Sequence, residues 1–144
     1  AIEYLKIISK KINSNNGGIL IIDYGYLKKN MKNTLKSISN HKFENVLNNF
    51  GKSDITYNLS FKLIEEILKK FNLKINGMTT QKNFLLNLGI LKRAEIISKN
   101  LPFSKKADIY YRVKRLIDKN SMGEIFKVMV GTKKNVNFQT GFVN

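Results

Sequence analysis

A short aliphatic run framed by glycines, GGILIIDYG at residues 17–25, most limits what this chain can fold into. Its four aliphatic residues, 19–22, lie between a glycine pair and the polar triplet Asp23-Tyr24-Gly25. A continuous apolar run of this kind is typical of a buried parallel strand, and its polar end should face a site. The pattern leaves open whether the chain is a complete functional unit or part of a sheet whose site needs other residues.

The segments around this strand predict an α/β protein. Residues 3–13 place apolar side chains at helical spacing before the turn sequence NSNNGG, so helix, turn and strand resemble the returning half of a βαβ unit. Residues 26–50 are polar and are expected to form a loop with short helical turns. The remaining predicted elements are a short extended segment at 55–59, a helix at 61–71 capped by Ser60, a strand at 73–77, a helix at 81–100 broken near Gly89, a helix at 105–118 and an aliphatic strand in MGEIFKVMVG, residues 122–131, with 125–130 as its centre. Leu63 and Leu88 belong to apolar stripes of their helices that are predicted to face the core.

Composition narrows the class of protein. The 144 residues, 42% of them hydrophobic, are enough for one compact domain. The chain has no cysteine, which excludes a disulfide framework and a cysteine nucleophile. Its single histidine leaves few of the side chains that usually bind zinc. No run approaches the roughly 20 apolar residues of a membrane span. Because the first residues begin inside an apparent helix without an initiating methionine, we expect the chain to continue upstream.

The formal net charge of +16 admits a partner of opposite charge, such as RNA or an acidic protein. Most of this charge is lysine, accompanied by asparagine and isoleucine, as A- and T-rich codons produce. The arginines that usually read bases are limited to Arg93, Arg112 and Arg115. Nucleic-acid binding is therefore given little weight, and a standalone lysine-rich binding module for RNA or acidic partners stays as the alternative function.

Six separated blocks resemble one family when they are taken together and in order. They are GGILIIDYG, NTLKSISNHKFENVL, FGKSDITYNLSF, TTQKNFLLNLGI, MGEIFKVMV and a final GF. In this order and spacing they resemble the C-terminal half of the MidA-like family of S-adenosylmethionine-dependent methyltransferases, which includes a mitochondrial complex I assembly methyltransferase. The resemblance extends from the first helix to Phe142.

The resemblance implies the C-terminal portion of a class I, Rossmann-like methyltransferase fold. Strand 19–24 would be the fifth strand of a seven-stranded mixed sheet, and 73–77 with 125–130 would be its closing antiparallel pair. The glycine-rich loop and the acidic residue that bind S-adenosylmethionine would lie upstream. Residues 1–144 are therefore expected to be the C-terminal part of the domain, with no cofactor-binding residues and no activity of their own, and strand 19–24 would have an unpaired edge.

The resemblance also implies residues on the substrate side, which are Asp23, Tyr24, Gly25, His41, Asp54, Thr56 and Gln81. The first three match the family's strand-end Asp-Tyr-Gly, although Asp23 could equally serve as a cap. The lone histidine could be a base or a structural residue. Two departures from the family pattern are Asn33, where an acid is usual, and Ser60, where an aspartate is usual. Since serine and aspartate both cap helices, position 60 is interpreted as structural.

The function implied is methylation of a protein, with arginine of a respiratory complex I subunit as the precedent. Carboxylates would hold the guanidinium, and Asp23 and Asp54 are the acids that we select. The catalytic residues stay unknown, and no metal is expected. The expected compartment is the cytoplasm of a bacterium or the mitochondrial matrix of a eukaryote.

Overall fold

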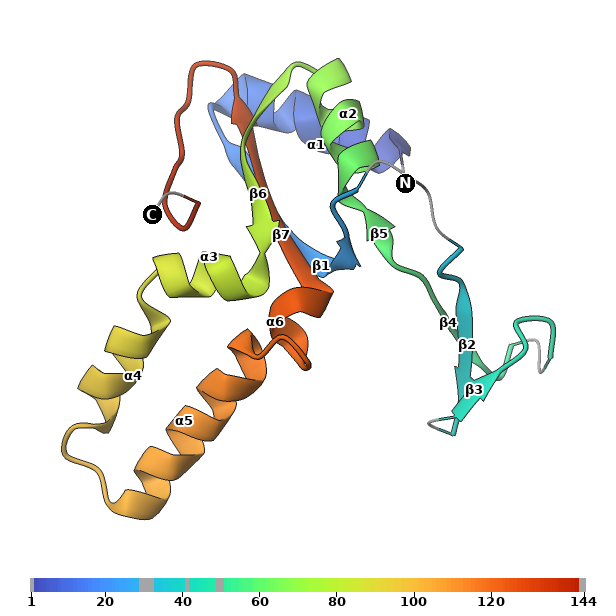
Figure 1. Cartoon of the computed structure of the whole chain (residues 1–144). Coiled ribbons are helices and arrows are strands. Elements are labelled where there is room, and N and C mark those ends of the chain that lie inside the picture. The colour runs from blue at the N-terminus through green and yellow to red at the C-terminus, as the bar shows by residue number, and fades with distance from the viewer. Residues whose placement is uncertain (1, 29–32, 41, 49–50, 143–144) are drawn as a thin grey trace.

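The fold is given by a computed structural model that describes residues 2–28, 33–40, 42–48 and 51–142. Most of the strands come in one consecutive run along the chain, and most of the helices come in another (Figure 1). In chain order the elements are α1 (Ile2–Asn15), β1 (Gly18–Tyr26), β2 (Lys36–Ser39), β3 (Lys42–Glu44), β4 (Asp54–Thr56), β5 (Leu59–Ser60), α2 (Phe61–Lys70), β6 (Leu73–Thr80), α3 (Gln81–Asn87), α4 (Ile90–Ser98), α5 (Phe103–Ile117), α6 (Met122–Ile125) and β7 (Phe126–Lys133).

The central sheet has the strand order β5-β1-β7-β6. Strand β1 pairs antiparallel with β7 from Gly18, opposite Thr132, to Tyr24, opposite Phe126. Strand β6 continues the sheet antiparallel on the other side of β7, whereas β5 pairs parallel with β1 at two positions. The mixed sheet with one parallel pair and a closing antiparallel pair confirms the predicted fold class.

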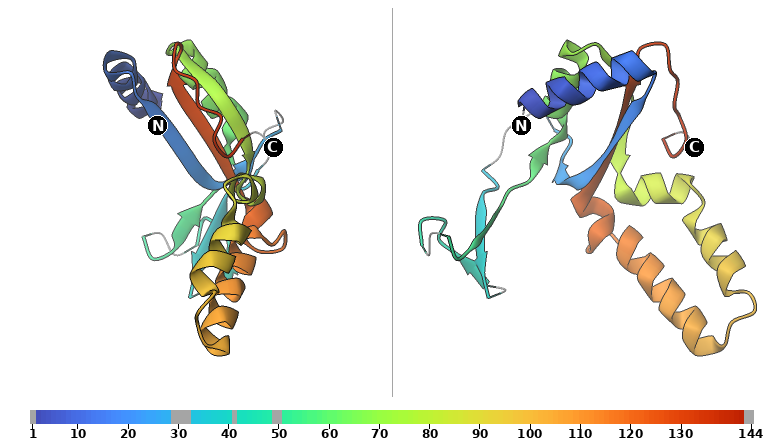
Figure 2. Two further views of the ribbon diagram at one scale, coloured as in Figure 1. Left: turned by 90° about the vertical axis from the view of Figure 1, so that its left-hand side faces the viewer. Right: turned by 180° about the vertical axis from the view of Figure 1, so that it is seen from behind.

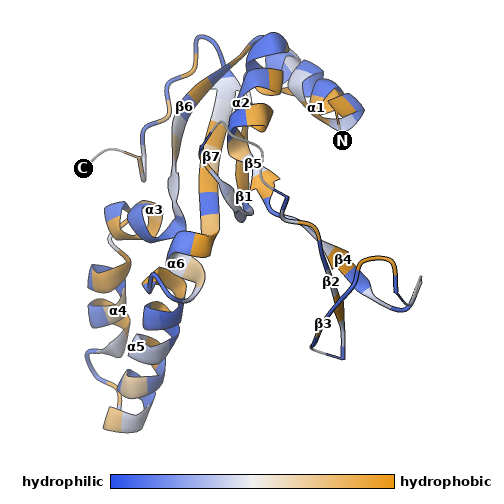
Figure 3. Ribbon diagram, turned by 45° about the vertical axis from the view of Figure 1, so that its right-hand side comes forward, coloured by the Kyte–Doolittle hydropathy of each residue, from blue (hydrophilic) through white to orange (hydrophobic). Residues whose placement is uncertain are grey.

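The largest buried cluster lies on one face of this sheet, beneath α1 and α2, whereas Val128 and Val130 of β7 are buried on the other face. The cluster consists of Ile12, Phe61, Leu68, Leu73 and Met129. Figure 3 shows the apolar stretches of β5, β7 and α2 gathered in the middle of the molecule. Burial of apolar side chains such as these is the dominant favourable contribution to the free energy of folding.

The aliphatic run of β1 predicted a strand covered on both faces, but only one of its faces is covered. Ile19 and Ile21 pack against the core cluster. Leu20 and Ile22 point to the opposite face, where they are 49% and 46% exposed. The difference arises because successive side chains of a strand alternate between faces, and α1 and α2 cover one of them.

Three local predictions were wrong. The predicted loop and helical turns of 26–50 contain a hairpin of β2 and β3, which β4 extends to a second sheet of order β3-β2-β4. Residues 122–125 form the helix α6, so β7 begins at Phe126. Leu63 and Leu88, predicted on core faces, are 48% and 46% exposed. Short strands owe their pairing to distant partners, which a local pattern does not show.

Two arms extend from the end of the central sheet at which β1 ends (Figures 1 and 2). One is the β-arm, which consists of β2, β3 and β4. The other is the helical arm, in which α4 and α5 run side by side. In the sequence, the two helices come after β6 and before β7. The break between α3 and α4 occurs at Gly89, as predicted, where the backbone adopts a left-handed φ of 74°.

Candidate functional site

The carboxyl end of β1 is the candidate site because four polar or conformationally special residues follow its aliphatic run. Asp23 is half-buried, and its Oδ1 accepts the backbone N–H of Tyr24 at 2.8 Å. Its cross-strand partner is Lys127, whose pKa is lowered, chiefly by burial. Lys127 donates to the Glu124 carbonyl, and no ion pair to Asp23 is found within the described residues. The Asp23 carboxylate therefore has capacity for a further cationic partner.

Tyr24 connects the candidate site to the β-arm. The Thr56 hydroxyl of β4 donates to the Tyr24 hydroxyl at 3.0 Å. The Tyr24 ring packs edge-on against Phe126, with 5.7 Å between ring centroids. A second hydrogen bond joins the segment before β2 to the segment after β4. In it, the Thr34 hydroxyl accepts the backbone N–H of Asn58 at 3.0 Å. Tyr24 and Thr56, predicted from separate motifs, thus lie in direct contact.

Gly25 has a packing role at the same strand end. A Cβ at this position would lie 2.3 Å from the Leu59 carbonyl oxygen and 2.9 Å from the Phe61 ring. Such contacts are too short for any side chain, so glycine alone lets β5 approach β1. The close approach supplies the parallel pairing of Gly25 with Leu59.

The structure places the other predicted residues differently. Asp54 is exposed at the start of β4, opposite Ile38. His41 lies outside the described residues. Gln81 is 7% exposed, and its side-chain amide donates to the Leu116 carbonyl at 2.9 Å, which joins α3 to the end of α5. Gln81 directly follows β6, whose last residue, Thr80, pairs with Lys127, so Gln81 lies at the same end of the sheet as Asp23.

Two tyrosines that sequence reasoning missed line a pocket between β1 and the β-arm. Tyr26 and Tyr57 contribute to an open pocket of about 250 Å³, together with Thr34 and Leu63. Each tyrosine directly follows a matched motif, Tyr26 after Gly25 and Tyr57 after Thr56. Adjacency to those motifs was the signal that could have identified them.

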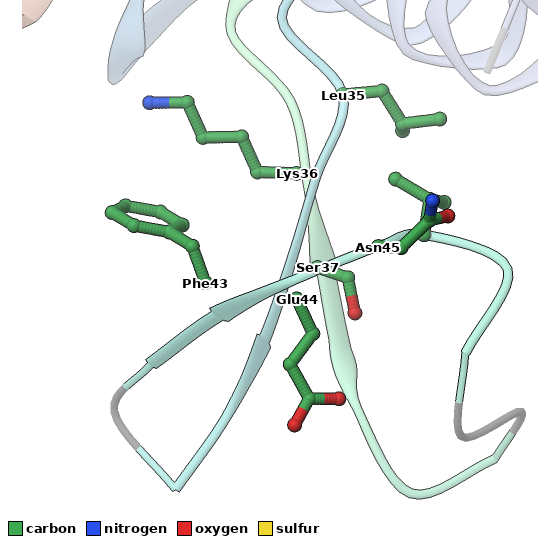
Figure 4. A pocket seen from close by; sticks show the side chains of 7 residues that line it. Leu35, Lys36, Ser37, Phe43, Glu44 and Asn45 are labelled. Atoms are coloured by element: carbon green, nitrogen blue, oxygen red, sulfur yellow. The ribbon is translucent and has the colours of Figure 1, made fainter.

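A larger open pocket, of about 560 Å³, lies on the β-arm itself (Figure 4). Lys36 and Phe43 point to the same side of the hairpin, and Nζ of Lys36 lies 5.2 Å from the Phe43 ring centroid. Ser37 is fully buried, and its Oγ has no hydrogen-bond partner among the residues that the structure describes. Such a pocket can accept a mixed apolar and polar side chain.

Metal and membrane sites were also considered for the described part of the chain. Among those residues, no group of three or more histidine, cysteine, aspartate or glutamate side chains could hold a metal ion. None of the helices described there combines the length and apolar character needed to cross a bilayer.

Comparison with curated proteins identifies relatives of one kind. "Protein arginine methyltransferase NDUFAF7, mitochondrial" of Xenopus tropicalis is 29% identical over 121 residues, which are 83% of this chain and 28% of the relative. The protein of the same name from Danio rerio is 27% identical over 120 residues, with the same two shares. The chain therefore spans 28% of the length of these relatives.

Comparison with solved structures shows the fold. An uncharacterized superfamily protein from Burkholderia thailandensis matches with a TM-score of 0.86 and 23% identity, over 99% of this chain and 39% of that chain. A second solved structure of a Burkholderia thailandensis member of that superfamily, bound to S-adenosyl-homocysteine, matches with a TM-score of 0.73 and 24% identity, over 99% of this chain and 36% of that chain.

The sequence also matches a protein family over a continuous segment. Residues 1–79 match the S-adenosyl-L-methionine-dependent methyltransferase family, which places α1, β1, the β-arm and α2 within it. This segment is more than half of the chain and includes the whole carboxyl end of β1. The chain belongs to this family of S-adenosyl-L-methionine-dependent methyltransferases.

Proposed function

We propose that this chain forms the C-terminal part of a methyltransferase domain that transfers a methyl group from S-adenosylmethionine to arginine in a protein. Membership of the family supports the reaction class, and the curated relatives are named protein arginine methyltransferases. The observation that carries the proposal is the position of Asp23 and Tyr24. Both lie at the carboxyl end of β1, where α/β sheets place their ligands.

The open edge of β1 supports a role for upstream residues of the same domain. Strand β5 pairs with β1 at Gly25 and Tyr26, so residues 18–24 have no strand partner on that side within the described chain. Leu20 and Ile22 are also half exposed on the face away from α1 and α2. An upstream strand at this edge, with helices over Leu20 and Ile22, would cover a surface that otherwise favours aggregation.

The residues of this chain do not fit a cofactor loop. Gly17 precedes β1 and Gly18 is its first residue, whereas a loop that binds a cofactor at the carboxyl end follows its strand. A Cβ at Gly18 would lie 3.1 Å from Cγ2 of Thr132, so this glycine serves the contact between β1 and β7. In the proposal, upstream residues hold S-adenosylmethionine, and this chain by itself transfers no methyl group.

The substrate side is assigned to the carboxylates near the β-arm. A guanidinium binds carboxylate oxygens through charge-assisted hydrogen bonds. Asp23 is fixed by its bond to the Tyr24 N–H, and Asp54 lies two residues before Thr56, the partner of Tyr24. The acceptor nitrogen gains a methyl group and loses a proton, while these residues align it and limit access of water. A subunit of respiratory complex I is the proposed protein substrate, on the resemblance described above.

Titration calorimetry tests the division of the domain. The chain alone and the chain extended upstream, through about five further elements, are each titrated with S-adenosylmethionine. We expect binding by the extended form and none by the chain alone. Binding by the chain alone would contradict the assignment of the cofactor site to upstream residues. Absence of binding by both forms would contradict the proposed methyltransferase function.

Variants of the extended form test the substrate side. Asp23→Asn and Asp54→Asn should each lower kcat/KM for an arginine-containing protein substrate by about tenfold or more, because each removes one charged partner of the guanidinium. Asp108→Asn is the matched control, since Asp108 is an exposed aspartate that pairs with Arg112 in α5. Equal activity of all three variants would remove Asp23 and Asp54 from the site.

A further inference from the structure

The far end of the helical arm carries an exposed apolar group, here called the arm tip. It consists of Ile96, Ile97, Leu101 and Phe103, which are 63%, 51%, 38% and 86% exposed. These residues belong to the last turn of α4, the connection to α5 and the first position of α5. Single exposed apolar residues are common, but four within eight positions at the end of a projecting arm suggest a partner.

Cations without partners flank the arm tip. Arg93, Lys99, Lys105 and Lys106 lie within a few residues of it, and none forms an ion pair within the described part of the chain. The nearby acids are already engaged in the arm itself. Glu95 pairs with Lys92 at 2.9 Å, and Asp108 pairs with Arg112 at the same distance. The tip therefore presents an uncompensated positive charge around an apolar end.

The position of the arm keeps this end away from the rest of the sheet. The helical arm connects β6 to β7 along the chain. The strand edge without a partner at residues 18–24 belongs to β1, on the other side of β7 from β6. Figures 1 and 2 show the connection between α4 and α5 as the most distant part of the arm. No residue of α5 is buried, so the arm has little core of its own.

We propose that the arm tip docks onto the surface of an anionic phospholipid membrane. The apolar side chains would enter the boundary between headgroups and acyl chains, while the four cations would remain at the level of the phosphates. Long lysine and arginine side chains suit this level because their apolar stems can lie along the boundary with the charge in water. The proposal is independent of the methyl transfer proposed above and concerns surface attachment, without any membrane-spanning segment.

The composition of the tip favours lipid over other acidic partners. Nucleic acid is bound by cations and by stacking on aromatic rings. Phe103 is the one aromatic member of the arm tip, and the aliphatic side chains of Ile96, Ile97 and Leu101 contribute to neither kind of contact. A protein partner would need a concave surface of matching shape, because stable protein interfaces are closely packed. A fluid bilayer adapts to a small convex tip without such a match.

Vesicle sedimentation tests the proposal with the chain, alone and in its upstream-extended form. The vesicles are pure phosphatidylcholine or an equimolar mixture of phosphatidylcholine and phosphatidylserine. We expect binding to the mixed vesicles, little binding to phosphatidylcholine, and a decrease with added salt because of charge screening. Absence of binding to the mixed vesicles would overturn the proposal.

Matched variants separate the arm tip from the general positive charge. Phe103→Ser should weaken binding by about tenfold, whereas Tyr4→Ser, at a tyrosine of α1 that is 72% exposed, should leave it unchanged. Lys99→Glu with Lys105→Glu should abolish binding, whereas Lys10→Glu with Lys11→Glu, the same charge change on α1, should reduce it slightly.

Circular dichroism of each variant reports whether the helices are retained, and all substituted side chains are exposed, so we expect intact folding. Equal losses for the two lysine pairs would mean nonspecific attraction and would overturn the proposal. Unchanged vesicle binding of Phe103→Ser, or self-association through the tip that excludes vesicles in analytical ultracentrifugation, would overturn it as well.

Discussion

The Thr56 hydroxyl donates a hydrogen bond to the Tyr24 hydroxyl at 3.0 Å, although 32 residues separate them in the sequence. Tyr24 belongs to the central sheet and Thr56 to the β-arm, so the bond joins the two sheets beside Asp23. The Tyr24 ring also packs against Phe126 at the start of β7. This contact sets how the arm meets the candidate site.

Tyr24→Phe should loosen the β-arm with little effect on global stability. The ring contact with Phe126 remains, and an exposed hydrogen bond is worth less than about 1 kcal/mol in the free energy of unfolding. Amide hydrogen exchange should become faster in β4 and β2, whereas β7 should be unchanged. A double-mutant cycle with Thr56→Val provides the control. Strictly additive effects of the two substitutions would show that the hydroxyls do not interact.

Gly25→Ala should separate β5 from β1. The new methyl group would lie 2.3 Å from the Leu59 carbonyl oxygen, which is backbone and has little freedom to move. We expect a loss of about 1–3 kcal/mol in the free energy of unfolding, measured by urea denaturation. Gly17→Ala is the matched control because its Cβ would meet one atom, Cα of Ile12, at 3.9 Å. Comparable losses in both variants would contradict a specific contact at Gly25.

Gln81→Leu should reduce stability and leave substrate recognition unchanged. The substitution removes the donor to the half-buried Leu116 carbonyl, and leaving such a group without its partner costs about 1 kcal/mol or more. The exposed neighbour variant Asn83→Ala should be close to neutral. In the upstream-extended form, KM for the protein substrate should stay the same for Gln81→Leu. A raised KM with unchanged stability would instead favour a pocket role for Gln81.

Glu65 should give the protein part of its dependence on acid pH. Hydrogen bonds from Lys62 and Lys69, at 2.6 and 2.5 Å, lower the pKa of this nearly buried carboxyl below its ordinary 4.5. The stabilisation is therefore complete above the ordinary pKa and is lost as the pH falls through the lowered pKa. It should be about 1 kcal/mol or less, since both lysines are largely solvated.

The measurement for Glu65 is the free energy of unfolding from about pH 6 to about pH 3, in the native chain and in Glu65→Gln. The variant should lose less stability over this range. Glu66→Gln, at the exposed neighbour, is the control and should follow the native curve. Parallel curves for the native chain and Glu65→Gln would contradict the assignment.

The sequence by itself determined the elements whose signals are local. Helical periodicity located α1, α2 and α5, and the Ser60 side chain accepts the Leu63 N–H at 3.4 Å, as expected of an N-cap. The left-handed Gly89 marks the predicted break after α3. These features were predictable because a helix satisfies its hydrogen bonds within one segment, and caps and glycines act over a few residues.

Only the tertiary structure decided which strands pair and which side chains meet. Gly18 lies opposite Thr132, and the β2–β3 hairpin forms in a segment whose sequence predicted loop and helical turns. The Tyr24–Thr56 bond and the burial of Gln81 likewise depend on segments far apart in the chain. A strand finds its hydrogen-bond partners in another segment, so its pairing and the site at its end are properties of the assembled sheet.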